Sequence, residues 1–204
     1  LVFVRADLDV NVEISNIQYP ISNIESATRL VNLKPTVDFL LDKGAKQIII
    51  AGHIGRPVGP DPVKSTKLLL EVLSNILKRE ISFKYDLEGE VSGEVVLLEN
   101  LRFSEGEIKT DIDFAKKLAG FADVYVNEAF GNSHREHASM AALPKFLSHA
   151  AGLHLEEEIK VLGEVLKNPK RPLIAIVGGA KLETKIPVIA NLSKHADKVL
   201  VGGE

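Results

Sequence analysis

The feature that most constrains the fold is a series of short apolar runs, rich in valine and isoleucine, with helical segments between them. Six such runs are candidate strands: 1–4, 47–51, 94–98, 123–126, 173–177 and 198–201. Each run is apolar on both faces, which is typical of parallel strands that helices cover on both sides. The order of strand, helix, strand and helix predicts a doubly wound, Rossmann-like, three-layer α/β fold.

The segments between the runs carry apolar residues at helical spacing. They are 29–41, 65–77, 111–118, 141–151, 155–166 and 182–192. Ser65 and Thr66 suit the start of the second helix, because their hydroxyl oxygens accept hydrogen bonds from free backbone N–H groups. Pro187 leaves the start of the last helix open, because proline has no N–H to donate within a helix.

The charged helix at 155–166 leads through a linker with two prolines into a new strand. We expect a first domain at 1–154, an interdomain helix and linker at 155–170, and the beginning of a second, similar domain at 171–204. The alternative is that 155–166 is an ordinary surface helix of one continuous domain. The chain opens directly on a strand and ends on a strand with an unfinished loop, so we expect it to be a piece of a longer protein.

Charge and composition exclude several classes of function. Lysine and arginine number 25 against 28 acidic residues, a net charge of −3, so attraction to nucleic acid or to an anionic membrane is not expected. There is no cysteine, which excludes disulfides and thiolate chemistry. Neither a membrane-spanning run of roughly 20 apolar residues nor a signal segment is present. We therefore expect a soluble, cytoplasmic protein.

Arginines are few and follow the predicted strands. Of the seven in the chain, four lie just past strand ends: Arg5, Arg56, Arg102 and Arg135. Ligands of open α/β sheets bind beyond the carboxyl ends of the strands, and guanidinium groups make paired contacts with carboxylate and phosphate. The pattern predicts a site for a small ligand with several negative charges. The alternative is that each arginine pairs with a nearby acid, such as Asp7, Glu99 or Glu128.

His53, His134 and His137 lie in the same loops. The spacing of His134 and His137 would suit a metal on a helix, but no carboxylate completes a zinc site and the surroundings are cationic. We expect these histidines to contact an anion or to hydrogen-bond within the fold, and we predict no metal site.

The loop Gly178-Gly179-Ala180-Lys181 follows a strand and precedes a helix. Glycines at such a place let the backbone approach a phosphate, and the helix N-terminus favours an anion. Lys185 lies one turn further on. The loop has neither the Walker A spacing nor G-x-G-x-x-G, and paired glycines are common in turns, so this signal is weak by itself.

Five segments, taken in order, resemble the phosphoglycerate kinase family across essentially the whole chain. R-A-D-L-D at 5–9 is similar to the family's R-V-D-F-N, G-H-I-G-R-P at 52–57 to S-H-L-G-R-P, and L-E-N-L-R-F at 98–103 to L-E-N-x-R-F. V-N-E-A-F-G at 126–131, followed by H-R-E-H-A-S at 134–139, resembles V-N-D-A-F-G-x-x-H-R-x-H-A-S. V-G-G-A-K at 177–181, with Lys185 following, resembles L-G-G-A-K-V-x-D-K-I.

The resemblance implies an ATP-dependent phosphotransferase of glycolysis that moves a phosphoryl group reversibly between 1,3-bisphosphoglycerate and ADP, giving 3-phosphoglycerate and ATP. Arg29 and Lys185 would then be catalytic, stabilising the moving group. The implied substrate-binding residues are Arg5, Asp7, Asp9, Arg29, His53, Arg56, Arg102, His134 and Arg135. The implied nucleotide-binding residues are Gly178, Gly179, Lys181 and Lys185, with Mg²⁺ bridging the nucleotide phosphates. The full-length protein would be a monomer.

The chain departs from the family pattern at several positions. Asp9 replaces a usual asparagine, Asn11 lies where a proline is usual, and Glu128 replaces an aspartate. The family is roughly twice this length, and most of its nucleotide site has no counterpart here. We therefore expect the chain alone to bind substrate without appreciable catalysis. The alternatives are a non-catalytic phosphoglycerate-binding module and, from another class, a dinucleotide-dependent oxidoreductase, which the lack of G-x-G-x-x-G disfavours.

Overall fold

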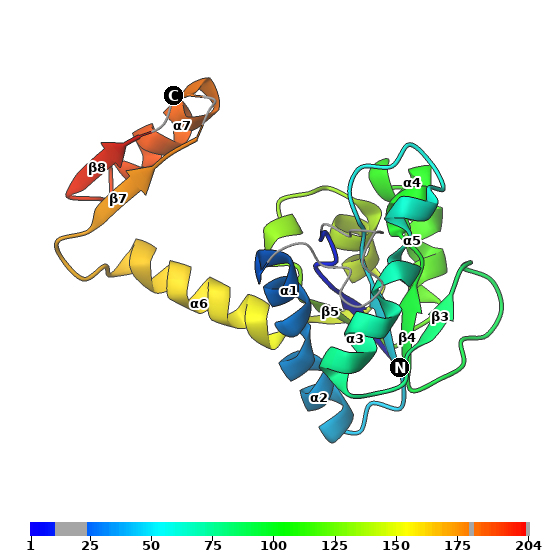
Figure 1. Ribbon diagram of the computed structural model, residues 1–204. Helices are drawn as coiled ribbons and strands as arrows, with labels where there is room; N and C mark the ends of the chain where they lie inside the picture. Colours follow the sequence, from blue (N-terminus) through cyan, green and yellow to red (C-terminus); the bar gives the residue numbers. More distant parts are fainter. Residues whose placement is uncertain (11–23, 180–181, 203–204) are drawn as a thin grey trace. The chain divides into compact units, whose positions relative to one another are not determined.

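The computed structural model describes residues 1–10, 24–179 and 182–202 (Figure 1). The chain divides into two compact units, Leu1–Glu156 and Glu157–Glu204.

A six-stranded, wholly parallel sheet forms the centre of the first unit, in the order β3-β4-β2-β1-β5-β6. This sheet confirms the predicted α/β class. Its strands are β1 (Val2–Arg5), β2 (Ile48–Ala51), β3 (Ser82–Lys84), β4 (Val95–Leu98), β5 (Val124–Asn127) and β6 (Ser148–Ala151). The four predicted strands of this unit are confirmed to within a residue or so, and β1 lies at the middle of the sheet.

The helices of the first unit are mostly short. The α-helices are α1 (Ile24–Val31), α2 (Leu33–Asp42), α3 (Leu70–Leu77), α4 (Glu105–Ile108) and α5 (Ile112–Ala119). Single turns of 3-10 helix are η1 (Pro62–Lys64), η2 (Thr66–Leu69), η3 (Leu101–Phe103), η4 (Phe130–Asn132) and η6 (Leu143–Lys145), and η5 (Ala138–Ala142) is a π-helix. Side-chain caps begin several of them: Ser65 accepts from Lys67 N, and Asp111 accepts from Phe114 N at 2.7 Å.

Helices cover both faces of the sheet (Figure 1). Successive side chains of a strand point to opposite faces, so Val2 and Val4 join one core cluster and Phe3 joins the other. The first cluster contains buried residues of α1, α2 and α3, and the second contains Phe114 and Leu118 of α5 together with residues of η5 and η6. Arg5 follows the same alternation and lies on the Phe3 face, where it meets Ser139 of η5.

Two helix predictions need correction. The predicted helix at 29–41 is two helices with a break at Asn32, because Pro35 has no N–H to donate to the carbonyl of Val31. The predicted helix at 141–151 is wrong: η5 ends at Ala142, Pro144 lies in the first turn of the short η6, and the chain then adds β6 to the free edge of β5. Strands β3 and β6 were not predicted, since one is three residues long and all four side chains of the other are exposed.

The second unit contains most of α6 (Leu153–Lys167), which begins in the first unit, and then β7 (Ile174–Val177), α7 (Leu182–Leu192) and β8 (Lys198–Val201). All four elements confirm the predicted pattern, with Pro187 inside α7. Strands β7 and β8 are parallel. The segments that precede them are joined by Asp197, which accepts hydrogen bonds from Leu173 N at 2.7 Å and Arg171 NH1 at 2.9 Å.

Across both units, the described helices include none that combines the length and the apolar character needed to span a membrane.

Candidate anion-binding site

The loops that follow β1, β2, β4 and β5 begin side by side, because the strands are parallel and in register. Arg5 pairs with Ala51 on one side and with Asn127 on the other. Backbone contacts then join the loops: Leu101 N donates to Gly52 O at 3.0 Å, and Glu128 N donates to Arg5 O at 2.9 Å. Most of the predicted site residues of the first unit are in this way brought to one edge of the sheet.

Asn100 holds the loop after β4 against the loop after β2. Its side-chain amide donates to Ile54 O at 2.9 Å and to Lys64 O at 2.8 Å, and its oxygen accepts from Arg102 N at 3.0 Å. Arg102 is mostly buried, and its NH1 donates to Gly55 O at 2.6 Å. The position of Arg102 is therefore set by the fold rather than by a ligand.

Asp9 is the acidic centre of this edge. Its carboxylate accepts from Gly55 N at 2.7 Å and lies 3.6 Å from His53 Nε2. The contact with His53, followed by the bond from Gly55, lowers the pKa of Asp9 to about 2 against the opposing effect of burial. Asp9 is therefore ionised at neutral pH.

Arg29 of α1 contacts the same loop. Its NH1 donates to the backbone oxygen of Asp9 at 3.0 Å and lies 3.6 Å from an Asp7 carboxylate oxygen. Asp7 also accepts from Asn132 Nδ2, at 3.3 Å, which joins the loop after β5 to the others. Arg29 and Asp7 are thus oriented together at the exposed side of the edge.

His53 lies beneath Asp9 and is 1% exposed. Its Nδ1 is 2.9 Å from Arg5 NH2. Burial lowers the pKa of His53, and the charges of Arg5 and Arg102 act in the same direction while Asp9 opposes them. The imidazole is therefore neutral at pH 7.

Arg5 differs from its predicted placement. It is the last residue of β1 rather than a residue past its end, and its side chain has no exposed surface. Its guanidinium donates to Ser139 Oγ at 2.8 Å and to the carbonyl of Ala6, besides its contact with His53. Arg5 therefore supports His53 from inside the fold.

Three side chains near this edge, those of Arg135, Arg56 and His134, have nitrogen atoms without a hydrogen-bond partner among the described residues. Arg135 Nε is buried and has no hydrogen-bond partner among the described residues. Repulsion from Arg135 adds to burial in lowering the pKa of Arg102, so the two arginines are near neighbours. Arg56 and His134 are exposed, and within the described ranges their side chains make no hydrogen bond or ion pair. The structure therefore places Arg29, Arg102 and Arg135 at this edge, and the exposed Arg56 and His134 belong to the loops that meet there.

Among the described residues, none of the four arginines after the strands forms an ion pair with Asp7, Glu99 or Glu128, and Asp7 lies 3.6 Å from Arg29 instead. Glu99 accepts instead from Ser65 Oγ at 2.6 Å and from Thr66 N at 2.9 Å. Glu128 accepts from Thr36 Oγ1 and from the first backbone N–H groups of α6, those of His154 at 3.1 Å and Leu155 at 3.3 Å. Both glutamates therefore cap helices, and their charges do not neutralise the cationic edge directly.

Residues that sequence reasoning did not assign complete the support of the site. Glu107 is fully buried and accepts from both the backbone N–H and the hydroxyl of Ser139, at 2.9 and 2.6 Å. His137 lies 3.8 Å from Glu107, and burial is the largest cause that lowers the pKa of His137. Ser139 could have been found from the sequence, because it belongs to the H-R-E-H-A-S segment. Nothing in the sequence distinguishes Glu107 from a surface glutamate.

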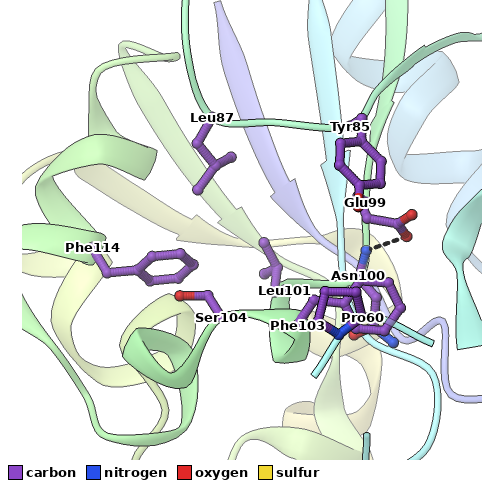
Figure 2. Close-up of a pocket in the computed structure, with 9 residues that line it drawn as sticks. All are labelled: Pro60, Tyr85, Leu87, Glu99, Asn100, Leu101, Phe103, Ser104 and Phe114. Atoms are coloured by element: carbon purple, nitrogen blue, oxygen red, sulfur yellow. Dashed lines mark hydrogen bonds between the residues drawn. The ribbon is translucent and has the colours of Figure 1, made fainter. Parts of the chain in front are cut away.

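A hollow of about 220 Å³ lies nearby, between β4, the loop after β3 and α5 (Figure 2). Its lining is mainly apolar: Pro60, Tyr85, Leu87, Glu99, Asn100, Leu101, Phe103, Ser104 and Phe114. Glu99 and Asn100 are joined in it by a hydrogen bond from Asn100 N, at 2.7 Å. None of the predicted site residues lines this hollow, so the cationic edge is a separate and more open feature.

The glycine loop of the second unit has the form that an approach to phosphate requires. Gly179 has φ +127°, a conformation that other residues rarely adopt, and the Lys185 side chain lies over it, with Nζ 3.8 Å from the position of a Cβ on Gly179. Gly178 is equally open, with Gly202 O at 3.5 Å as the nearest atom. Lys181 lies outside the described residues. In the described ranges no group of three or more His, Asp or Glu side chains could hold a metal ion.

Comparison with known proteins gives a consistent result. The sequence model described as "PGK: Phosphoglycerate kinase" matches residues 1–204. A phosphoglycerate kinase of Fervidobacterium nodosum is 42% identical over 186 residues, which cover 86% of this chain and 46% of the relative. One of Leptospira biflexa is 42% identical over 212 residues, which cover 99% of this chain and 52% of the relative.

Solved structures agree in fold. The phosphoglycerate kinase of Coxiella burnetii superposes with a TM-score of 0.83 at 34% identity, covering 99% of this chain and 51% of that one. The enzyme of Pyrococcus horikoshii gives 0.82 at 32% identity, with 99% and 52% covered. The chain thus spans about half the length of the relatives it matches.

Proposed function

Because the chain belongs to the phosphoglycerate kinase family, we propose that it supplies the acid-substrate half of a kinase that transfers a phosphoryl group between 1,3-bisphosphoglycerate and ADP. Residues 1–154 bind 3-phosphoglycerate and its acyl phosphate, 155–170 form the connection, and 171–204 begin the nucleotide-binding domain. The protein acts in glycolysis in the cytoplasm as a monomer.

One observation carries the substrate assignment: a cationic edge in which Arg56 and the Nε of Arg135 have no partner among the described residues. Phosphoglycerate carries a carboxylate at one end and a phosphate at the other. Planar guanidinium groups on several loops suit both ends, because each forms paired hydrogen bonds with such oxygens. Arg56, Arg102 and Arg135 supply this positive surface, and His134 offers a ring N–H to the carboxylate. Asp7 and Asp9 accept a hydrogen bond from the hydroxyl, with His53 beside Asp9.

Arg5 enters this proposal as a support and not as a contact. Its guanidinium is fully buried and its donors are directed at Ser139, Ala6 and His53. Arg29 is better placed for the reacting end of the substrate, since it is partly exposed beside Asp7.

The second unit contributes to the nucleotide side. Gly178, Gly179 and Lys185 suit the phosphates of ADP or ATP, because the open glycine backbone and the amine beside it can approach oxygens closely, and Lys181 belongs to the same motif. Mg²⁺ arrives with the nucleotide, and it neutralises phosphate charge when bound. Phosphoryl transfer needs alignment and charge stabilisation more than a protein nucleophile. Arg29 and Lys185 provide that charge at the transferred group.

The first experiment is calorimetric titration of the chain with 3-phosphoglycerate. Arg56→Ala is expected to weaken binding by about 10–100-fold, the range for a lost hydrogen bond to a charged group. The matched control is Arg79→Ala. Arg79 lies at the opposite edge of the sheet, with its NH1 3.1 Å from Glu94 Oε2, and its loss is expected to change affinity less than twofold.

No binding by a folded sample, or equal losses for both variants, would contradict the substrate assignment. A coupled assay on the full-length protein separates the two remaining readings. Turnover that is lost on Arg29→Ala supports the kinase, whereas tight substrate binding without turnover supports the binding module.

A further inference from the structure

A chain of buried polar side chains runs beneath the cationic edge, from Glu107 through Ser139 and Arg5 to His53. Glu107 accepts the Ser139 hydroxyl at 2.6 Å, Ser139 Oγ accepts Arg5 Nε at 2.8 Å, and Arg5 NH2 lies 2.9 Å from His53 Nδ1. The four residues come from α4, η5, β1 and the loop after β2. They therefore connect the inside of the fold to the ligand side of the sheet.

The chemistry of each group fixes the direction of every bond in this chain. A guanidinium only donates, so Ser139 Oγ and His53 Nδ1 must both accept from Arg5. The single Ser139 proton is then directed to the Glu107 carboxylate. Because Nδ1 accepts, the proton of the neutral His53 ring is on Nε2. That N–H faces the Asp9 carboxylate, 3.6 Å away at the partly exposed edge.

Because these four side chains are buried, their polar groups can be satisfied only by other groups of the protein and not by water. Arg5, Glu107 and Ser139 have no exposed surface, and His53 is 1% exposed. Among the described residues, no ion pair joins the guanidinium of Arg5 to an acid, so its charge reaches Glu107 through one hydroxyl group. Removing the Ser139 hydroxyl leaves the Arg5 guanidinium and the Glu107 carboxylate without the group that connects them, and water does not reach the buried site to replace it.

We propose that Glu107 and Ser139 are positioning residues for the anion site, holding Arg5 in the one orientation that keeps His53 as the Nε2–H tautomer with its donor facing the Asp9 carboxylate at the edge of the site. The assignment of a ligand to this edge rests on the proposed function, whereas the state of His53 does not.

Other charged groups also face His53. Asp9 from the loop after β1 and Arg102 from η3 both act on it, and His53 in turn acts on His137, which lies 3.8 Å from Glu107. Asp9 favours a protonated ring and Arg102 disfavours it. Of the described residues, Arg5 is the one whose hydrogen bond reaches Nδ1, so the choice of tautomer depends on the Glu107–Ser139 side of this series of hydrogen bonds.

The test is nitrogen NMR of the histidine side chains in the ligand-free protein, with ¹⁵N-labelled histidine. The wild-type His53 ring is expected to show a protonated Nε2 and a bare Nδ1. In Ser139→Ala, where Arg5 loses its anchor, the His53 signals are expected to shift towards a mixture of tautomers or a protonated ring. The matched control is Ser133→Ala, which removes a hydroxyl that contacts Asn127 and Ala129 O but lies off the chain.

Glu107→Gln provides a second variant of nearly unchanged volume, should Ser139→Ala fail to fold. It keeps an acceptor for Ser139 but removes the charge, and it is expected to move the His53 signals in the same direction by a smaller amount. Affinity for 3-phosphoglycerate is expected to fall at least fivefold in Ser139→Ala and less than twofold in Ser133→Ala.

A wild-type His53 that is protonated on Nδ1, or His53 signals that are unchanged in both Ser139→Ala and Glu107→Gln, would overturn the proposal. A fixed tautomer that Ser139→Ala releases supports it, even in a protein that does not bind 3-phosphoglycerate. That combination would count against the proposed function alone.

Discussion

Strands β2 and β7 have nearly the same composition and opposite surroundings. I-I-I-A at 48–51 lies between β1 and β4 with helices over both faces, and all four of its residues are buried. I-A-I-V at 174–177 pairs only with β8, and Ile176 at its centre is 79% exposed. An apolar sequence therefore favours a buried strand, but the burial itself depends on neighbouring strands and helices.

The polar sites differ in the same way. In the first unit several of the site's side chains are held by neighbouring loops, as Arg102 is by Asn100 and by Gly55 O. In the second unit Lys185 lies over Gly179 and, within the described ranges, makes no hydrogen bond. Preorganised charge requires supporting contacts around the charged group, and among the described residues these surround the Arg102 side chain and not that of Lys185.

The sharpest test of this contrast is one substitution made in both strands. Ile49→Ala, at a side chain with no exposed surface, is expected to lower the free energy of unfolding by about 2–5 kcal/mol, because it removes buried methyl groups and leaves a cavity. Ile176→Ala is expected to change it by less than about 0.5 kcal/mol.

Urea unfolding measures both variants. Tyrosine fluorescence reports the first unit, since Tyr19, Tyr85 and Tyr125 all precede the division at residue 156, and far-ultraviolet circular dichroism adds the second. Equal losses for the two variants would break the comparison, because β7 would then be as buried in solution as β2.

A pair of glycines gives an intermediate effect of opposite sign. A Cβ on Gly152 would lie 1.9 Å from Glu128 Oε2, so Gly152→Ala must displace the carboxylate that caps α6 and is expected to cost about 1–3 kcal/mol. Gly163, inside α6, has no atom within 4 Å of such a Cβ, and Gly163→Ala is expected to stabilise the helix by about 0.5–1 kcal/mol. Thermal unfolding of the two variants checks both signs; stabilisation by Gly152→Ala would refute the capping role of Glu128.

The last effect is a dependence on pH that belongs to the first unit and builds up gradually as the pH falls. The pKa values of His53 and His137 are lowered in the folded state, chiefly by burial, so the unfolded chain binds protons first as the pH falls below about 6.5. The stability that is present above that pH is lost towards the folded-state pKa values, by up to about 1.4 kcal/mol per pH unit for each histidine.

Urea midpoints followed by tyrosine fluorescence between pH 7.5 and 5 measure this slope. The double variant His53→Gln and His137→Gln is expected to flatten it. A slope that persists in the double variant would assign the acid sensitivity to other groups.

Much of the fold was predictable, because the Val/Ile runs are specific to strands covered on both faces. The exceptions have physical reasons. Strand β6 is an exposed edge, so its residues have no apolar pattern, and the break at Asn32 depends on a proline three residues later. Helix α6 starts at Leu153, before the predicted 155, because a side chain from the end of β5 caps it.

The sequence predicted which charged residues lie near one another at the site. It did not predict which of them are exposed and which are buried supports. The arginines after the strands were expected at one edge of the sheet, and the parallel register brings their loops together there. A shift of one residue at the end of β1 turns Arg5 from the ligand side to the interior, because side chains alternate along a strand. Glu107 contacts Ser139 across 32 residues of sequence, and no local pattern connects the two.

The central place of β1 has a consequence for the time course of synthesis. Val2 pairs with Val124, and the neighbouring Leu1 and Asp123 are separated by 122 positions in the chain. At about 5–20 residues per second, a ribosome needs roughly 6–25 seconds to cover that distance. The nascent β1, with Val2, Phe3 and Val4, must remain without its second neighbour for all of that interval, so three apolar side chains that are buried in the finished sheet wait uncovered on that side while the chain is being made.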